Sequence, residues 1–309
     1  MVKVSVIVPV YNASRYLEKC LDSLVRQTLK DIEIIVVNDA SKDNSLEIIK
    51  KYQEKYSNII LINHETNKGI GRTRNDAIEI AKGEYLGFVD SDDYVAENMY
   101  EKYYNYAVEN KLDMVYAGHY EVFNEQLKKI DVHDFEPCLL KDNPDLLVKM
   151  EFGPWNKIYR TDIIRQNNIR FPEKLKYEDM PFAATALDYS RIGKLEGYHY
   201  FYLIHSNSES TTIDKRCFDI FDILDIINSH YGNRYHDQIE YLNILHVTRY
   251  LLRQKYQKEK EIRDRFIEQG YAFLDERFPD WRNNRYYKKQ SFARRLIKNN
   301  KLLMKLYCR

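Results

Sequence analysis

The sequence lacks the features that place a protein across a membrane or outside the cell. No stretch approaches the roughly 18 apolar residues that a membrane-spanning helix needs. The N-terminus has no charged region followed by an apolar run and a cleavage site, so we expect no secretory signal. The four cysteines are scattered without the paired spacing of a zinc site, and they are expected to be reduced thiols. These absences predict a protein of the cytoplasm or of the inner face of the cell membrane.

The residues that are present suit a globular protein with a substantial core. The chain has 309 residues, of which 44% are hydrophobic and 31% are charged. This length accommodates one large domain or a domain with an appendage. We find no internal repeat and no low-complexity linker.

The net charge of +1 hides a strong asymmetry along the chain. Residues 282–309 contain ten Lys or Arg and no acid, which leaves 38 basic against 47 acidic residues in 1–281. Apolar residues recur at helical spacing among these cations, namely Phe292, Leu296, Leu303 and Leu306. Basic amphipathic helices bind anionic membrane surfaces. The alternatives are a helix packed on the body and a disordered tail, and no recognition motif supports nucleic-acid binding.

Short apolar runs alternate with helical patterns through the first 95 residues. Continuous apolar strands of this kind predict a parallel sheet covered by helices on both faces. Ligands bind such sheets beyond the carboxyl ends of the strands, and the polar residues of this sequence fall there. The expected strands are 4–9, 32–37, 59–62 and 85–89, and the expected helices are 14–27 with Ser14 as cap, 43–56 and 71–82.

The rest of the chain is less regular and then becomes helical. Residues 96–213 mix short apolar segments with charged connections, whereas helical patterning dominates from 216 onward. We therefore expect an α/β domain over 1–213. A helical region over 214–309 follows it and ends in the basic tail.

Three carboxylates lie within four residues in Asp90-Ser91-Asp92-Asp93, directly after the fourth strand. Like charges this close repel one another, and burial adds to the penalty unless a cation lies among them. Carboxylate oxygens are ligands that suit Mg²⁺ or Mn²⁺ bound to substrate phosphates. The alternative is an acidic turn or a helix cap, and the strand context favours the metal site.

Two further segments carry groups suited to a nucleotide. Asp39 follows the second strand and can accept a hydrogen bond from a base, while Tyr11 can stack on that base. Asp39 and Ser41 can equally cap the next helix. Residues 67–75 open a helix with two glycines and three cations, which favours phosphate, although such segments are often only turns.

Four motifs in order resemble the family 2 glycosyltransferases of GT-A fold: SVIVPVYN at 5–12, VVNDASKDNS at 36–45, NKGIGRTRN at 67–75 and GEYLGFVDSDD at 83–93. WNKIYR at 155–160 and KYEDMPF at 176–182 are similar to segments of bacterial capsule and cell-wall members. The resemblance covers roughly residues 3–210. It implies an α/β fold with a Rossmann-like, mostly parallel sheet flanked by helices, and an inverting transfer from a UDP-sugar.

The resemblance also implies roles for individual residues. The donor would be held by Pro9, Tyr11, Asp39, Arg74, Asp90 and Ser91, with Arg74 near the diphosphate and Asp90 at the ribose. Asp92, within a DXD motif, would ligate Mn²⁺ or Mg²⁺. His205, at the start of a loop over 205–211, could add a metal contact, or it could be a solvent-facing histidine.

On the acceptor side, the same resemblance makes Asp179 the general base, which would deprotonate the attacking hydroxyl. Without this resemblance, an acidic pair such as Glu178-Asp179 would more often be interpreted as a helix cap. Glu178, Trp155 and Asn156 are the expected acceptor contacts, although a lone Trp more often belongs to the core.

The predicted function is therefore sugar transfer from a UDP-sugar to a glycan or lipid-linked saccharide in the synthesis of bacterial surface polysaccharide or glycoconjugate. A non-catalytic partner or sensor of the same fold is the alternative, and the presence of a base argues against it. A nucleotidyltransferase would carry a Gly-rich loop after the first strand, where this chain has Pro-Val-Tyr-Asn-Ala at 9–13. The sequence leaves the sugar, the acceptor, the linkage and the oligomeric state open.

Overall fold

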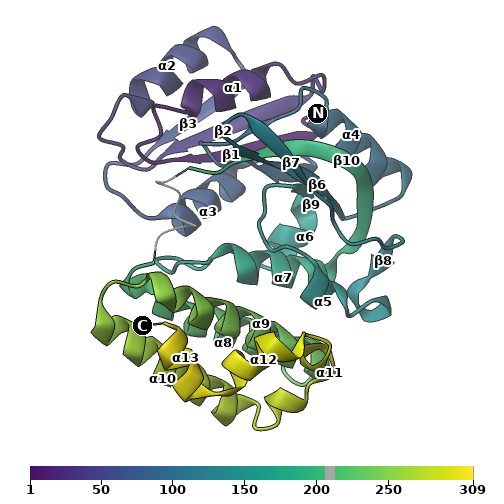
Figure 1. Ribbon diagram of the computed structural model, residues 1–309. Coiled ribbons are helices and arrows are strands. Elements are labelled where there is room, and N and C mark those ends of the chain that lie inside the picture. Colours follow the sequence, from purple (N-terminus) through teal and green to yellow (C-terminus); the bar gives the residue numbers. More distant parts are fainter. Residues whose placement is uncertain (206–212, 309) are drawn as a thin grey trace. The chain divides into compact units, whose positions relative to one another are not determined.

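A computed structural model of the chain describes residues 1–205 and 213–308, apart from the side chains of 292–294. The chain divides into two compact units (Figure 1). We call the first the α/β unit, which comprises Met1–Asn143, Glu151–Lys174 and Glu178–Ser206 as far as described. The second, the helical unit, comprises Pro144–Met150, Leu175–Tyr177 and the described residues beyond 206. The predicted domain boundary at 213 stays a prediction.

The α/β unit is built on one sheet of ten strands. Its strands are β1 Val4–Val10, β2 Ile32–Asn38, β3 Ile59–Asn63, β4 Tyr85–Phe88, β5 Tyr94–Val95, β6 Met114–Phe123, β7 Gln126–Ile130, β8 Cys138–Leu139, β9 Lys157–Arg160 and β10 Arg191–Leu203. Its helices are α1 Leu17–Val25, α2 Ser45–Lys55, α3 Ile70–Ile80, α4 Met99–Glu109, the 3₁₀ turn η1 Leu140–Asp142, α6 Thr161–Gln166 and α7 Asp179–Tyr189.

The strand order is β3-β2-β1-β4-β9-β6-β10-β5, with β7 added to β6 and β8 to β10. Strands β3, β2, β1 and β4 are parallel neighbours, and β6 and β10 are also parallel. The antiparallel β9 joins these two groups between β4 and β6. The predicted α/β class with a mostly parallel, helix-flanked sheet is confirmed.

The strands of this sheet are apolar throughout because both faces are covered. Every residue of β1 and β2 is buried, as expected for parallel strands between helix layers. Side chains alternate between faces, so Val6 and Val8 meet Leu17 and Leu21 of α1 in one core. On the other face Phe88 packs edge-on against Phe171 and Phe182, with ring centres 5.4 and 5.5 Å apart.

The local predictions for the first four strands and three helices agree with the structure to within a few residues. The first helix is the exception, since it begins at Leu17 and its cap residue is Tyr16. The prediction that Ser14 caps this helix is wrong. Its backbone N–H instead donates to the Asp43 carboxylate at 2.9 Å, which ties the loop after β1 to the loop after β2.

The helical unit contains the elements predicted from residue 216 onward. Its elements are α5 Leu146–Lys149, η2 Lys215–Phe218, α8 Asp219–Tyr231, α9 His236–Arg253, η3 Gln254–Tyr256, α10 Lys260–Arg277, η4 Trp281–Asn283, α11 Arg285–Lys288, α12 Phe292–Asn299 and α13 Lys301–Tyr307. The basic tail is thus helical in α12 and α13, and the buried Met304 shows that α13 packs within this unit. Within the described ranges, no helix is long and apolar enough to cross a bilayer.

Candidate active site

The carboxyl ends of β1, β2 and β4 lie side by side, which brings the predicted polar segments to one edge of the sheet. The register pairs Val10 with Asn38 across β1 and β2, so both strands end together. The loops that follow are linked by two hydrogen bonds. Asn12 N–H donates to Ser41 Oγ at 3.0 Å, and Lys42 N–H donates to Asn12 Oδ1 at 2.7 Å. Pro9 is buried at this edge, whereas the Tyr11 ring is 53% exposed and free to stack on a flat ligand.

Asp39 is almost fully buried and organises the loop that leads into α3. Its two carboxylate oxygens accept from the backbone N–H groups of Lys68 and Gly69 at 2.8 and 2.9 Å. Its Oδ1 also lies 2.8 Å from His64 Nδ1, and His64 Nε2 lies 3.0 Å from Asp76. Sequence reasoning did not single out His64, whose position becomes clear only when β3 is placed beside β2.

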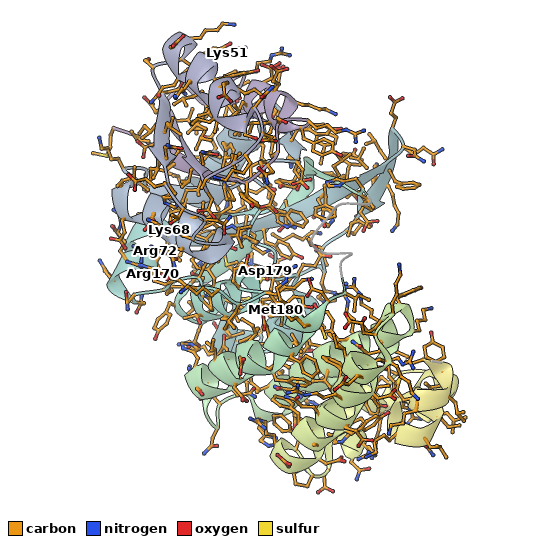
Figure 2. All side chains as sticks on the ribbon, turned by 90° about the vertical axis from the view of Figure 1, so that its left-hand side faces the viewer. Lys51, Lys68, Arg72, Arg170, Asp179 and Met180 are labelled. Atoms are coloured by element: carbon orange, nitrogen blue, oxygen red, sulfur yellow. The ribbon has the colours of Figure 1, made fainter. Side chains whose placement is uncertain are left out.

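The cations of the 67–75 segment are tied to carboxylates of the same unit. Lys68 and Arg72, labelled in Figure 2, both reach Asp76, at 3.5 and 2.7 Å. Arg74 is 3% exposed and holds Asp90 through Nη2 at 2.8 Å and Glu178 through Nη1 at 2.6 Å. A diphosphate contact by Arg74 stays a prediction, and the structure shows Arg74 joining Asp90 to Glu178.

The three clustered carboxylates have different surroundings. Asp93 is 1% exposed and accepts from Tyr200 Oη at 2.6 Å and from Leu203 N–H at 2.7 Å, so it anchors β10. The side chains of Asp90 and Asp92 are 25% and 31% exposed. Burial, and then the charges of Asp92 and Asp90, raise the pKa of Asp93 well above its ordinary value. Asp93 is therefore structural, and Asp90 and Asp92 are the members that a ligand can reach.

Asp92 lies beside a histidine that follows β10 by two residues. His205 Nε2 lies 2.9 Å from Asp92 Oδ2, and the imidazole stacks on Tyr16 with ring centres 4.8 Å apart. Burial, and next the charge of Asp90, raise the pKa of Asp92, while the contact with His205 opposes the rise. The rest of the predicted loop, residues 206–211, lies outside the described residues.

Glu178 and Asp179 lie at the start of α7, where Figure 2 labels Asp179. Burial is the largest influence on both carboxyls, and the charge of Glu178 acts next on Asp179, so that the pKa of Asp179 is raised to about 7. Arg74 acts in the opposite direction on both groups. A carboxylate with a pKa near neutrality is suited to accept a proton at physiological pH.

A buried lysine lies close enough to Asp179 for their charges to interact. Lys157 is fully buried at the start of β9, and its Nζ donates to Gly153 O at 2.7 Å and to Asn156 Oδ1 at 2.6 Å. Burial lowers the pKa of Lys157 to about 7, against the charges of Glu151 and Asp179. Asn156 is also fully buried and donates to Ala117 O at 3.0 Å, so it holds β9 against β6.

Trp155 belongs to an aromatic stack at the same edge of the sheet. Its ring lies 4.6 Å from that of Tyr200 and 5.4 Å from that of Tyr202, both in stacked orientation. The residue as a whole is only partly exposed. Acceptor contacts by Trp155, Asn156 and Glu178 stay predictions.

Tyr200 is a site-building residue that sequence reasoning missed, since it lies 107 residues from Asp93. Its hydroxyl also accepts from Asp90 N–H at 3.2 Å. Replacing Tyr200 with Phe should lower the free energy of unfolding by about 1–3 kcal/mol, because the Asp93 carboxylate and the Asp90 N–H each lose a hydrogen bond. Chemical denaturation measures this loss. Tyr104→Phe is the control, since that hydroxyl bonds the half-buried Glu84 at 3.0 Å. Equal losses in the two variants would contradict the role assigned to Tyr200.

Sequence comparison identifies the family to which these motifs belong. The profile of Glycosyl transferase family 2 matches residues 5–170. "Uncharacterized glycosyltransferase YibD" of Escherichia coli is 32% identical over 275 residues, which cover 80% of this chain and 79% of that protein. Fold and family thus define the class as a glycosyltransferase. The chain belongs to glycosyl transferase family 2.

Two further relatives indicate the range of this family. "Poly(ribitol-phosphate) beta-glucosyltransferase" of Bacillus spizizenii is 37% identical over 222 residues, which cover 68% of this chain and 34% of that protein. The chain therefore corresponds to about a third of that relative's length. S. aureus TarS 1–349, solved in complex with UDP-GlcNAc, has a TM-score of 0.79 over 99% of this chain and 89% of that one. At 24% identity this likeness shows the shared GT-A fold.

Proposed function

We propose that this glycosyltransferase moves a sugar from a UDP-sugar to a hydroxyl of a surface or cell-wall polymer, with inversion at the anomeric carbon. The observation that carries the proposal is the half-buried Asp179, whose raised pKa suits a base and which is connected through its neighbour Glu178 and Arg74 to the donor-side Asp90. The acceptor would be a glycan, a lipid-linked saccharide or a polyol-phosphate polymer of the kind named for a relative. We also propose that the chain works at an anionic membrane surface.

The proposed chemistry is a direct displacement in one step. Asp179 removes the proton of the acceptor hydroxyl as its oxygen bonds to the anomeric carbon. The bond from that carbon to the diphosphate oxygen breaks at the same time, and its electron pair leaves with UDP. Tyr11 and Asp39 would bind the uracil, with Pro9 behind them, and Asp90 and Ser91 would contact the ribose.

The residues at the donor side fit a divalent metal. Asp92 offers a half-exposed carboxylate, and the His205 imidazole beside it adds a nitrogen that Mn²⁺ accepts. Among the described residues, the buried His205 Nδ1 has no hydrogen-bond partner. Asp92 and His205 would therefore hold Mn²⁺ or Mg²⁺ together with the diphosphate. The bound ion would stabilise the negative charge that develops on the departing UDP.

This proposal predicts thermal stabilisation by UDP that depends on metal and on Asp92. At a UDP concentration of about 100 times Kd, ligand binding should add about 2.7 kcal/mol to the stability of the wild type. Asp92→Asn should lose most of the gain that Mn²⁺ adds, because it removes the charged ligand. Differential scanning fluorimetry with a panel of UDP-sugars, with and without Mn²⁺, measures both effects.

The control for this experiment is Asp31→Asn, which changes an exposed carboxylate at the opposite end of β2. It should respond to UDP and Mn²⁺ as the wild type does. Absence of any response to UDP-sugars, with or without Mn²⁺, would overturn the proposed donor site. A non-catalytic sensor would instead bind the donor normally, and replacing Asp179 would not change its function.

A further inference from the structure

The C-terminal helix α13 has two faces of opposite character. Met304 and Cys308, one turn apart, are 0% and 1% exposed, and Cys308 Sγ lies 3.5 Å from Leu251 O of α9. Leu302 and Leu306, also one turn apart, are 66% and 51% exposed. Residues 302 and 304 differ by about 200° around a helix, so the two pairs lie on opposite sides. The inner pair anchors α13 to the helical unit, and the outer pair presents two leucines to solvent.

Aromatic rings and a lysine extend this exposed surface within the same unit. Tyr307 is 41% exposed and Tyr256 of η3 is 64% exposed. Lys255 Nζ lies 5.6 Å from the Tyr307 ring centre and 4.6 Å from that of Tyr256, which places the two rings close together. We call the four residues Leu302, Leu306, Tyr307 and Tyr256 the C-terminal apolar face.

Lysines flank this face and outnumber the carboxylate that they contact. Lys301 and Lys305 both approach a single carboxylate, that of Glu268, so one positive charge of this trio is uncompensated. Lys255 lies between the two tyrosine rings of the same face. Residues 282–309 carry ten basic and no acidic residues. The surface therefore combines exposed leucine and tyrosine side chains with a net positive charge.

We infer that the C-terminal apolar face docks on a bilayer that contains anionic lipids. Leucine side chains can enter the interfacial region, tyrosines suit the boundary between water and hydrocarbon, and lysines attract the anionic headgroups. Charge complementarity favours lipid over the same face of a second copy, because two such faces would repel each other. The inference makes specific the proposed membrane setting and is independent of the transfer chemistry.

Vesicle co-sedimentation of the full chain, without any donor, tests this inference. We expect the wild type to sediment with vesicles containing about one-third phosphatidylglycerol and to remain in solution with pure phosphatidylcholine vesicles. Raising the salt concentration should weaken the binding, because surface charges are then screened. Leu302→Glu combined with Leu306→Glu should lower the partition coefficient at least about ten-fold.

The matched control is Phe123→Glu combined with Leu127→Glu, on the β6–β7 hairpin. These side chains are 55% and 52% exposed, so the control makes the same change in charge at similar exposure. It should bind anionic vesicles within two-fold of the wild type. Equal loss in both double variants, or no wild-type binding, would overturn the inference. A third result would also overturn it. In that case the wild type would form dimers and fail to bind vesicles, and the Leu302→Glu, Leu306→Glu double variant would be monomeric. Donor binding would be unaffected in each case, which keeps this test separate from that of the donor site.

Discussion

Asp179→Asn is expected to lower turnover by about 10²- to 10⁴-fold while leaving donor affinity near the wild-type value. Asn cannot accept the proton of the acceptor hydroxyl, and loss of a positioned general base has effects of this size. Asp90 and Asp92, the proposed donor-side groups, keep their surroundings, so UDP should still bind. Steady-state kinetics together with UDP titration separates the two effects. A variant that retains turnover within ten-fold of the wild type would remove the assignment of the base.

The same variant should be more stable than the wild type at pH 8. Burial raises the folded-state pKa of Asp179 to about 7 from an ordinary 3.8, so the folded protein holds a proton that the unfolded chain releases between these values. This group's contribution to stability is therefore fully present below about pH 3.8 and is lost as pH rises to 7. Asn carries no charge to bury, and a pKa raised by about 3 corresponds to an expected gain of about 4 kcal/mol at pH 8. Denaturation at pH 5 and pH 8 measures it.

Asp162→Asn provides the control for both measurements, since Asp162 is an exposed acid in the first turn of α6. It should change neither turnover nor the pH dependence of stability. In the wild type, kcat/KM should rise with pH toward a plateau above about pH 7, as the Asp179 carboxyl loses its proton. A rate that falls over this range would contradict the proposed role.

Arg74→Met is expected to lower the free energy of unfolding by about 3–5 kcal/mol. The substitution leaves Asp90 and Glu178 without their shared cation, and removing one partner of a buried ion pair has effects of this size. Burial works to lower the pKa of Arg74, yet the charges of Asp90 and Glu178 keep it raised, so the guanidinium stays charged. Chemical denaturation gives the loss. Turnover should also fall, because Glu178 no longer has a fixed position beside the base.

Arg72→Met is the matched control on the same helix. Arg72 is 45% exposed and pairs with Asp76 and Glu173, and ion pairs of this kind contribute at most about 1 kcal/mol. Arg74→Lys retains the charge, but a single ammonium group cannot bond two carboxylates as the two Nη atoms of Arg74 do. Its free energy of unfolding should therefore lie between those of the wild type and Arg74→Met. Similar losses in Arg72→Met and Arg74→Met would refute the special role of Arg74.

Gly71, the second glycine of the 67–75 segment, illustrates what local patterns leave out. A Cβ atom on Gly71 would lie 2.2 Å from the Pro172 carbonyl oxygen, so glycine lets α3 approach the 171–174 backbone. Asn75 completes this contact through two hydrogen bonds with the Phe171 backbone, at 2.8 and 2.9 Å. The sequence suggested phosphate binding for this segment, whereas the structure shows that part of it is used for packing against a distant loop.

The sequence by itself determined the first four strands, the three helices among them to within a few residues, and the edge of the sheet at which the polar residues lie. Apolar runs of strand length and apolar residues at helical spacing are local properties, and parallel strands bring their carboxyl ends together wherever the sheet forms. Only the tertiary structure showed which of the three clustered carboxylates is structural and which two a ligand can reach. Asp93 is structural because Tyr200 and Leu203 reach it from β10, Asp92 faces His205, and Arg74 joins Asp90 to Glu178. The partners contributed by β10, His205 and Glu178 lie about a hundred residues away along the chain. A local sequence pattern cannot predict which distant segments come into contact.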